Sequence, residues 1–181
     1  MKNYDTFTKK EAKKFGKDLY NNWHINSEEK FAFFIYRISS VFSRKINKDA
    51  RNNNYNVIVE INSNALERSF INQEIVVKRE TNKDFLSAND TNFDDVKKDD
   101  VLIEKGFTST FLYQPKWICR GTVRLKIRVP KGINGAYINP IFWGFQFEHE
   151  LLLNKNMKYL VEEKRYEGKI LYLDLLCLGY L

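Results

Sequence analysis

The sequence is poor in cysteine and histidine, and this scarcity excludes several kinds of site. Two cysteines, Cys119 and Cys177, are too few for a disulfide framework and do not have the spacing of metal ligands. Two histidines, His24 and His149, cannot build a zinc site without carboxylate ligands. We therefore expect no metal in the functional site.

Apolar runs and linker residues are also scarce. No apolar stretch approaches the roughly 20 residues of a membrane span, so we expect no stable membrane insertion. The N-terminal segment MKNYDTFTKK is polar, and no secretory signal is visible in it. Three prolines and eight glycines among 181 residues argue against long flexible linkers. With 43% hydrophobic residues, the chain is expected to fold as a single domain over residues 1–181.

The formal charge is +7 at pH 7, with a pI near 9.3. Such a charge suits nucleic acid or an anionic membrane surface, but equally an acidic protein or a polyphosphate cofactor. The lysines and arginines are spread along the chain without one dense block. Because no nucleic-acid-binding motif accompanies them, we expect no nucleic-acid partner.

The first third of the chain has the pattern of helices. Phe15, Leu19 and Trp23 recur at four-residue steps and form one apolar stripe on a basic helix. Asn26 with Glu29 three residues later resembles a capping box, which predicts the start of a second helix.

A third helix is predicted over residues 42–50, ending in an asparagine-rich turn at 52–54. After about residue 74 the apolar pattern has a period of two, which is typical of strands. Strands are predicted at residues 75–77, 123–129, 147–153, 157–163 and 169–178, with a loop and a short helix between 82 and 100. Helices followed by strands predict an α+β fold, helical over about 1–72 and β-rich over about 73–181.

Two glutamates near the end of the chain are the first candidates for chemistry. On a strand, residues two apart point to the same face, so Glu148 and Glu150 would project together while His149 points away. Two adjacent carboxylates repel each other unless a cation or a cationic transition state lies between them. From the pair alone, two exposed strand carboxylates and a catalytic pair are both open interpretations.

Two further motifs precede the glutamates in a fixed order. They are Val77-Lys78-Arg79 and Lys105-Gly106-Phe107-Thr108-Ser109-Thr110. This order resembles the arginine, Ser-Thr-Ser and Glu-x-Glu signature of the mono-ADP-ribosyltransferase toxins. Within that group the chain is similar to the enzymatic subunits of clostridial binary toxins and to the Rho-modifying exoenzymes. Further matches are Phe15-Gly16 with Tyr20 and Trp23, Ile46-Asn47 with Arg51, Gly135-Ala136-Tyr137, and the run from Glu150 to Leu153.

The resemblance implies a fold, a reaction and a location. The fold would be N-terminal helices packed on a two-sheet, mainly antiparallel β core of the ADP-ribosyltransferase type. The reaction would transfer ADP-ribose from NAD to a protein side chain and release nicotinamide, with NAD hydrolysis as a side activity. The protein would be a secreted bacterial toxin that acts in the cytosol of the target cell.

The resemblance also implies which residues bind NAD. A guanidinium binds phosphate oxygens in a planar, bidentate way that lysine cannot reproduce. For Arg51 the alternative is an ion pair at the surface, and for Trp117 it is a place in the core. The implied NAD-binding residues are Tyr20, Asn47, Arg51, Arg79, Thr110, Trp117 and Arg120.

The catalytic roles implied are three. Glu150 would stabilise the positive charge that develops on the ribose, and Ser109 would hydrogen-bond Glu150 and hold its rotamer. Glu148 would orient the acceptor and take a proton from it. Phe111 stands where the last serine of the motif is usual, so that polar contact is missing here.

The acceptor and the partners are implied by the same likeness. In the Rho-modifying relatives the first residue of the Glu-x-Glu position is glutamine and the acceptor is asparagine. Glu148 at that position therefore implies an arginine acceptor. Phe145 resembles an aromatic residue that contacts the protein substrate. Actin is the expected target and a separate delivery component an expected partner. The alternative is a domain that kept the fold, lost catalysis and serves as a docking module.

Overall fold

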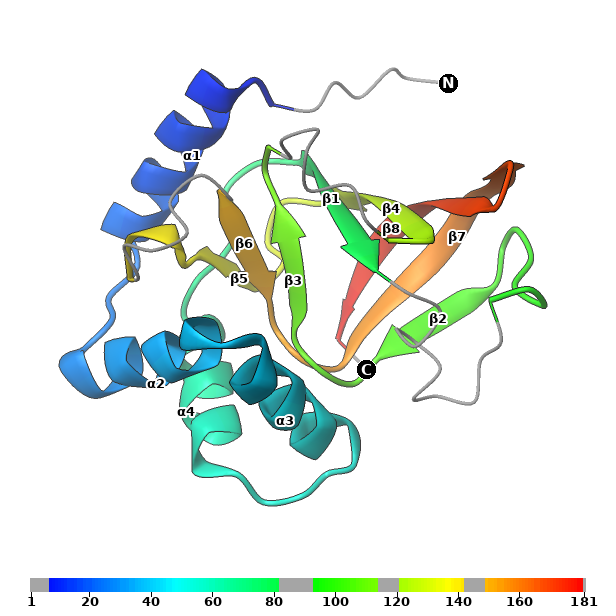
Figure 1. The fold of residues 1–181 in the computed structure, drawn as a ribbon. Coiled ribbons are helices and arrows are strands. Elements are labelled where there is room, and N and C mark those ends of the chain that lie inside the picture. The colour runs from blue at the N-terminus through cyan, green and yellow to red at the C-terminus, as the bar shows by residue number, and fades with distance from the viewer. Residues whose placement is uncertain (1–6, 82–92, 114–120, 142–148, 181) are drawn as a thin grey trace.

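The computed structural model describes residues 7–81, 93–113, 121–141 and 149–180. Four helices come first along the chain, and the strands follow (Figure 1). The helices are α1 (Lys9–Asn21), α2 (Ser27–Ile38), α3 (Ser40–Arg51) and α4 (Val57–Leu66). The strands are β1 (Ile75–Thr81), β2 (Val101–Glu104), β3 (Thr108–Phe111), β4 (Val123–Val129), β5 (Gly135–Tyr137), β6 (Glu150–Leu153), β7 (Met157–Glu167) and β8 (Ile170–Tyr180), and a 3₁₀ turn, η3, covers Asn139–Ile141. The α+β prediction is confirmed.

Capping side chains begin the first two helices. Asn26 accepts a hydrogen bond from the Glu29 amide, and the Glu29 carboxylate accepts one from the Asn26 amide, which completes the predicted capping box of α2. Thr8 and Glu11 form the same arrangement at α1. The predicted stripe of α1 is buried, and the Trp23 indole just beyond the helix donates to the Ala65 carbonyl.

Helix α4 is not among the three helices predicted from the sequence. It opens with the β-branched run Val57-Ile58-Val59, a composition that favours strands. The Asn56 side chain caps it by accepting from the Ile58 amide, and Ala65 and Leu66 are completely buried in the helical core. Tertiary burial therefore decides the helical state here.

The described strands form one mixed eight-stranded sheet in the order β2-β7-β8-β4-β1-β3-β6-β5. The β4–β8 pair is parallel and the other pairs are antiparallel. Strand β1 joins β4 along its whole length, and it joins β3 through the pair Lys78↔Phe111. The second sheet that the resemblance implied is thus not seen among the described residues, because β1 makes the two halves continuous.

Three of the helices gather at one end of β3 and β6, and α1 stands apart beside β5 and β6 (Figure 1). A Cβ added at Gly16 of α1 would lie 2.6 Å from the Tyr137 ring, so glycine permits the close approach of this helix to β5. Strand β4 has the predicted alternation, with Val123, Leu125 and Ile127 buried between half-buried basic residues. Strands β2 and β3, each only four residues long, were not predicted.

The predicted strand 147–153 begins only at Glu150 among the described residues. His149 has φ 47°, in the left-handed region, so strand alternation stops at that residue. The expectation that His149 points away from the face of Glu148 and Glu150 assumed a strand through all three residues, and the backbone of His149 does not have strand geometry. Residues 142–148 lie outside the described part of the chain.

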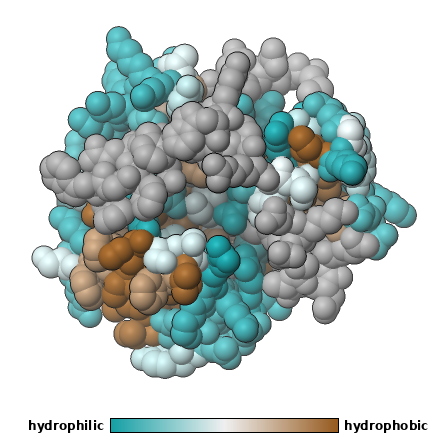
Figure 2. All heavy atoms as spheres, viewed as in Figure 1, coloured by the Kyte–Doolittle hydropathy of each residue, from teal (hydrophilic) through white to brown (hydrophobic). Residues whose placement is uncertain are grey.

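One face of the molecule carries an apolar patch (Figure 2). Its exposed members are Phe31 and Ile38 of α2 with Val41 and Phe42 of α3. Ile38, Val41 and Phe42 flank the corner at which α2 turns into α3, and Phe31 lies about two turns earlier on α2.

Candidate active site

Glu150 is the first residue of β6, and it is 6% exposed. In the antiparallel β3–β6 pair Phe111 lies opposite Glu150, so Ser109 is a diagonal neighbour on the same face. The Ser109 hydroxyl donates a hydrogen bond of 2.6 Å to Glu150 Oε1. The hydrogen bond expected between these two side chains is therefore present.

Arg37, in the last turn of α2, holds the other carboxylate oxygen. Its Nε donates to Glu150 Oε2 at 2.8 Å, and its Nη1 donates to the carbonyls of Ile138 and Asn139 at 3.0 and 3.2 Å. The side chains of Arg37 and Glu150 are only 2% and 8% exposed, so the ion pair is buried. Two carboxylate oxygens with two different donors fix the orientation of Glu150.

Arg37 was not predicted as a site residue, although the sequence carries a signal for it. The residue lies four positions after Phe33 and eight after Glu29, and all three are buried on the same face of α2. A charge on the buried face of a helix needs a buried partner. The partner itself cannot be read from the sequence because it lies 113 residues away.

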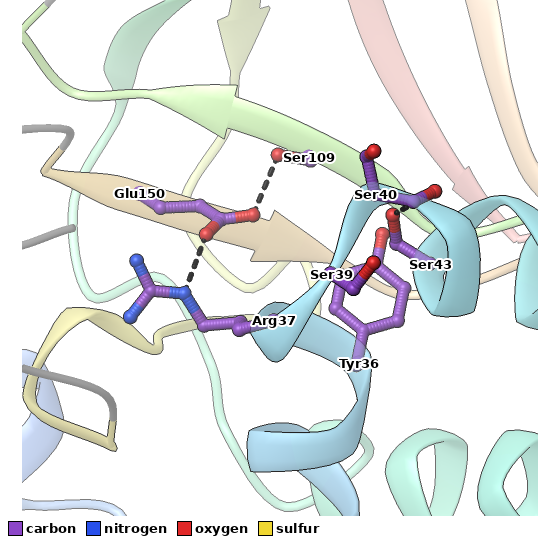
Figure 3. Close-up of a pocket in the computed structure, with 7 residues that line it drawn as sticks. All are labelled: Tyr36, Arg37, Ser39, Ser40, Ser43, Ser109 and Glu150. Atoms are coloured by element: carbon purple, nitrogen blue, oxygen red, sulfur yellow. Dashed lines mark hydrogen bonds and ion pairs between the residues drawn. The ribbon is translucent and has the colours of Figure 1, made fainter. Parts of the chain in front are cut away.

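A cavity of about 290 Å³, which we call the glutamate cavity, opens in front of this carboxylate (Figure 3). Serine hydroxyls from the α2–α3 corner line it on the side facing Ser109 and Glu150. Ser39 caps α3 by accepting from the Val41 amide, so the corner is fixed by its own hydrogen bonds. The lining residues are Tyr36, Arg37, Ser39, Ser40, Ser43, Ser109 and Glu150.

Tyr36 lines the glutamate cavity, and Asn47 contacts Tyr36 from behind. The Tyr36 hydroxyl accepts from Asn47 Nδ2 at 3.1 Å, and Asn47 Oδ1 accepts from the Phe107 amide at 2.7 Å. Burial, and then the charge of Glu150, raise the pKa of Tyr36 to about 12. Tyr36 is therefore a neutral hydroxyl at physiological pH. Asn47 links α3 to the segment that leads into β3.

Arg79 lies on β1, beside the Ser109 strand. Its Nη1 donates to the Ser109 carbonyl at 2.6 Å. Loss of water around the guanidinium lowers the pKa of Arg79, but an arginine remains charged. The structure thus brings Arg79, Ser109 and Glu150 together on three neighbouring strands, β1, β3 and β6.

Arg51 makes a different contact from the one expected of a phosphate ligand. Its Nε and Nη2 donate to the two Glu104 oxygens at 2.8 and 3.1 Å, a bidentate pair in which the carboxylate is 1% exposed. Glu104 also accepts from the Gly106 amide at 2.6 Å. The pair ties the C-terminal end of α3 to the turn that precedes β3.

Thr110 and Tyr20 lie away from the glutamate cavity. The Thr110 hydroxyl donates to the Leu151 carbonyl at 2.7 Å and is completely buried. Tyr20 is half-buried on α1, and its ring meets Trp23 edge-on with 6.4 Å between centroids. Four further predicted site residues lie outside the described residues: Trp117, Arg120, Phe145 and Glu148.

The described residues contain no group of three or more histidine, cysteine, aspartate or glutamate side chains that could hold a metal ion. Within the same residues, no helix is long and apolar enough to cross a membrane.

Comparison with known proteins places the chain in a family. The sequence model described as ADP-ribosyltransferase exoenzyme matches residues 12–170. None of the curated proteins that were compared matches the chain. Several solved structures share its fold.

Plx2a, an ADP-ribosyltransferase toxin from Paenibacillus larvae, is 22% identical with a TM-score of 0.79, over 94% of this chain and 96% of that one. C3stau2 from S. aureus, solved with NAD, is 21% identical with a TM-score of 0.81, over 97% of this chain and 99% of that one. The enzymatic component C2-I of the C2-toxin from Clostridium botulinum is 21% identical with a TM-score of 0.76, over 98% of this chain and 49% of that one. At these identities the likeness shows the fold.

Proposed function

The chain belongs to the ADP-ribosyltransferase exoenzyme family, and on that premise we propose that it transfers ADP-ribose from NAD to an arginine side chain of a host protein. The observation that carries the proposal is the buried Glu150 carboxylate at the glutamate cavity, held by Ser109 on one oxygen and Arg37 on the other. The similar C3stau2 structure was solved with NAD, which supports NAD as the substrate.

The residues of the cavity fit part of a dinucleotide. The Ser39 and Ser40 hydroxyls can donate to ribose or phosphate oxygens, and Arg79 supplies a positive charge beside Ser109. The side chains of Asn47 and Arg51 are occupied by Phe107 and Glu104, and these contacts favour a role in holding the turn before β3. We therefore assign the diphosphate to Arg79, with Arg120 as a second candidate.

The chemistry proposed for Glu150 is electrostatic. Bound NAD supplies a ribose carbon that becomes positively charged as nicotinamide leaves. A carboxylate fixed beside that carbon stabilises the transition state more than the ground state, because the charge is absent at the start. Ser109 and Arg37 keep the carboxylate in place, so little reorganisation is needed when the charge develops.

The proposal that the acceptor is an arginine depends on Glu148. An arginine is protonated in water, with a pKa above about 12, and so a carboxylate is needed to orient it and take a proton during attack. Actin is our proposed target, with a Rho-type GTPase as the competing one. The apolar patch around the α2–α3 corner supports a protein acceptor, since exposed apolar surface beside a cavity is typical of protein-binding sites.

A labelling experiment tests this function. The protein is incubated with labelled NAD and a eukaryotic lysate, and the modified residue is mapped by mass spectrometry. We expect one labelled protein modified on arginine, and loss of labelling in Glu150→Gln, a substitution that keeps the side-chain volume. Labelling on asparagine would disprove the role given to Glu148, and undiminished labelling by Glu150→Gln would disprove the mechanism.

One observation favours a second candidate, a docking module without catalysis. Arg37 neutralises Glu150 in a buried pair, and Phe111 replaces a polar residue of the motif. NAD hydrolysis measured without any acceptor separates the two candidates. Release of nicotinamide that depends on Glu150 supports the enzyme, and absence of release together with absence of labelling supports the docking module.

A further inference from the structure

A second cavity lies between α1 and the segments at η3 and His149. Its volume is about 420 Å³, and we call it the lysine cavity. It shares no lining residue with the glutamate cavity, although His149 and Glu150 are consecutive in the chain. The lining residues are Lys9, Lys13, Lys17, Tyr137, Asn139, Pro140 and His149.

Three lysines give this cavity a positive wall. Lys9, Lys13 and Lys17 follow at four-residue steps on α1, so their side chains lie on one face of the helix. Within the described residues none of the three has an ion-pair partner, and no acidic residue lines the cavity. Like charges four residues apart repel one another. A bound anion would remove that repulsion.

The opposite wall carries a buried polar atom without a partner. His149 is 3% exposed, and its Nδ1 lies 3.1 Å from the Tyr137 hydroxyl. Its Nε2 is buried and has no hydrogen-bond partner among the described residues. Buried polar atoms are normally satisfied, so this ring nitrogen in the cavity wall is a candidate contact for a bound ligand. In the tautomer where Nδ1 accepts from Tyr137, Nε2 carries the proton and can donate to an anionic oxygen.

The field of the lysines reaches this histidine. Burial, and then the charges of Lys9 and Lys13, lower the pKa of His149. The same field that disfavours a second positive charge favours a negative one. The cavity therefore combines positive charge with a buried ring nitrogen that needs a partner.

We propose that the lysine cavity binds a small anion with two or more negative charges on phosphate groups, at a site separate from the glutamate cavity. Lys9, Lys13 and Lys17 supply the charge, and His149 contacts a phosphate oxygen. Carboxylates are a poorer match, because three ammonium groups on one helix face suit a ligand with several oxygens and more than one charge. The phosphate can belong to a soluble compound or to a lipid headgroup.

One residue of the lysine cavity also contacts Glu150 and Arg37. Asn139 lines the lysine cavity, and its Oδ1 accepts from the Glu150 amide at 3.3 Å and from Arg37 Nη2 at 3.4 Å. Asn139 would therefore connect an anion bound in the lysine cavity to the Glu150 backbone and to Arg37.

Titration calorimetry with inorganic pyrophosphate tests the proposal. The test variant is Lys9→Gln with Lys13→Gln, and the matched control is Lys10→Gln with Lys14→Gln, which removes the same charge at the same spacing outside the cavity. All four lysines are exposed, so we expect both variants to fold. We expect one saturable site whose dissociation constant rises at least tenfold in the test variant and less than twofold in the control.

Two further measurements locate and identify the ligand. Pyrophosphate should shift the ring nitrogen resonances of His149, and an excess of NAD should not displace it. Sedimentation with phosphatidic acid vesicles identifies the source: binding lost in the test variant alone indicates a lipid headgroup, and no vesicle binding indicates a soluble phosphate compound. Equal weakening in the two variants, displacement by NAD, or no binding of pyrophosphate would overturn the proposal.

Discussion

Two donors share the carboxylate of Glu150, and they make different contributions. Ser109 is a neutral hydroxyl that fixes one oxygen, and Arg37 is a buried cation that fixes the other and neutralises the charge. The serine should therefore matter for the rate of the reaction, and the arginine should matter for both the fold and the site. Two substitutions separate these contributions.

Ser109→Ala removes the hydrogen bond to Oε1 without adding bulk. We expect kcat for NAD cleavage to fall by about tenfold to a hundredfold, since a small displacement of a reacting group costs up to about 10² in rate. The KM for NAD should change less than about twofold. The matched control is Ser43→Ala, because Ser43 lines the same cavity but donates to the Ser40 carbonyl. Equal losses in both variants would contradict the positioning role of Ser109.

Arg37→Met leaves a buried carboxylate without its cation. We expect the free energy of unfolding, measured with urea, to drop by about 3–5 kcal/mol, the usual cost of breaking a buried ion pair. The control is Lys45→Met, which removes the ion pair between Lys45 and Asp49. Because the Lys45 side chain is 71% exposed, the loss in the free energy of unfolding should stay below about 1 kcal/mol. Similar losses at the two positions would show that the Arg37 pair is not effectively buried.

At the scale of elements, local signals determine where helices begin but not always whether they form. The Asn26–Glu29 box marks the start of α2, whereas α4 has a β-branched opening and becomes helical through its contacts in the core. Strands β2 and β3 are too short to show a period, and their pairing partners are distant in the sequence. Strand β3 nevertheless carries Ser109, so one of the least predictable elements supports the site.

The cap of α2 gives a prediction at this scale. Asn26→Ala leaves the Glu29 amide without its acceptor, and we expect a loss of about 1 kcal/mol in the free energy of unfolding. Ser27→Ala, at the next and exposed position, should change it by less than about 0.5 kcal/mol. Thermal and urea unfolding of the two variants provide the comparison, and an equal effect would mean that the box contributes nothing beyond helix propensity.

For the whole molecule, folding brings residues from distant segments to one carboxylate. Arg37 comes from α2, Ser109 from β3 and Glu150 from β6, and Arg79 adds a charge from β1. The same folding buries His149 against Tyr137 and leaves the lysines of α1 around it. Because burial lowers the pKa of His149, we expect the stability of the whole chain to change with pH through this histidine.

We expect His149 to make the protein less stable in acid. Burial lowers its folded pKa below the unfolded value of about 6.5, so the unfolded chain binds the proton more readily. This contribution is complete above the unfolded pKa and is lost as the pH falls toward the folded pKa. We expect the free energy of unfolding to decrease between pH 7.5 and 5.5, and to decrease less in His149→Asn, because asparagine tolerates the left-handed backbone. Equal slopes in the two proteins would contradict the prediction.

The sequence by itself determined the family, the α+β class, the first helices and the alternating strand β4, because these depend on local patterns and ordered motifs. It also predicted the hydrogen bond between Ser109 and Glu150, while the catalytic roles stay predictions. Only the tertiary structure revealed that Arg37 pairs with Glu150, that Arg51 pairs with Glu104, and that the lysines of α1 face His149. The physical reason is that the partner of a buried charge is chosen by packing between distant segments, and a pattern of neighbours in sequence carries no record of that choice.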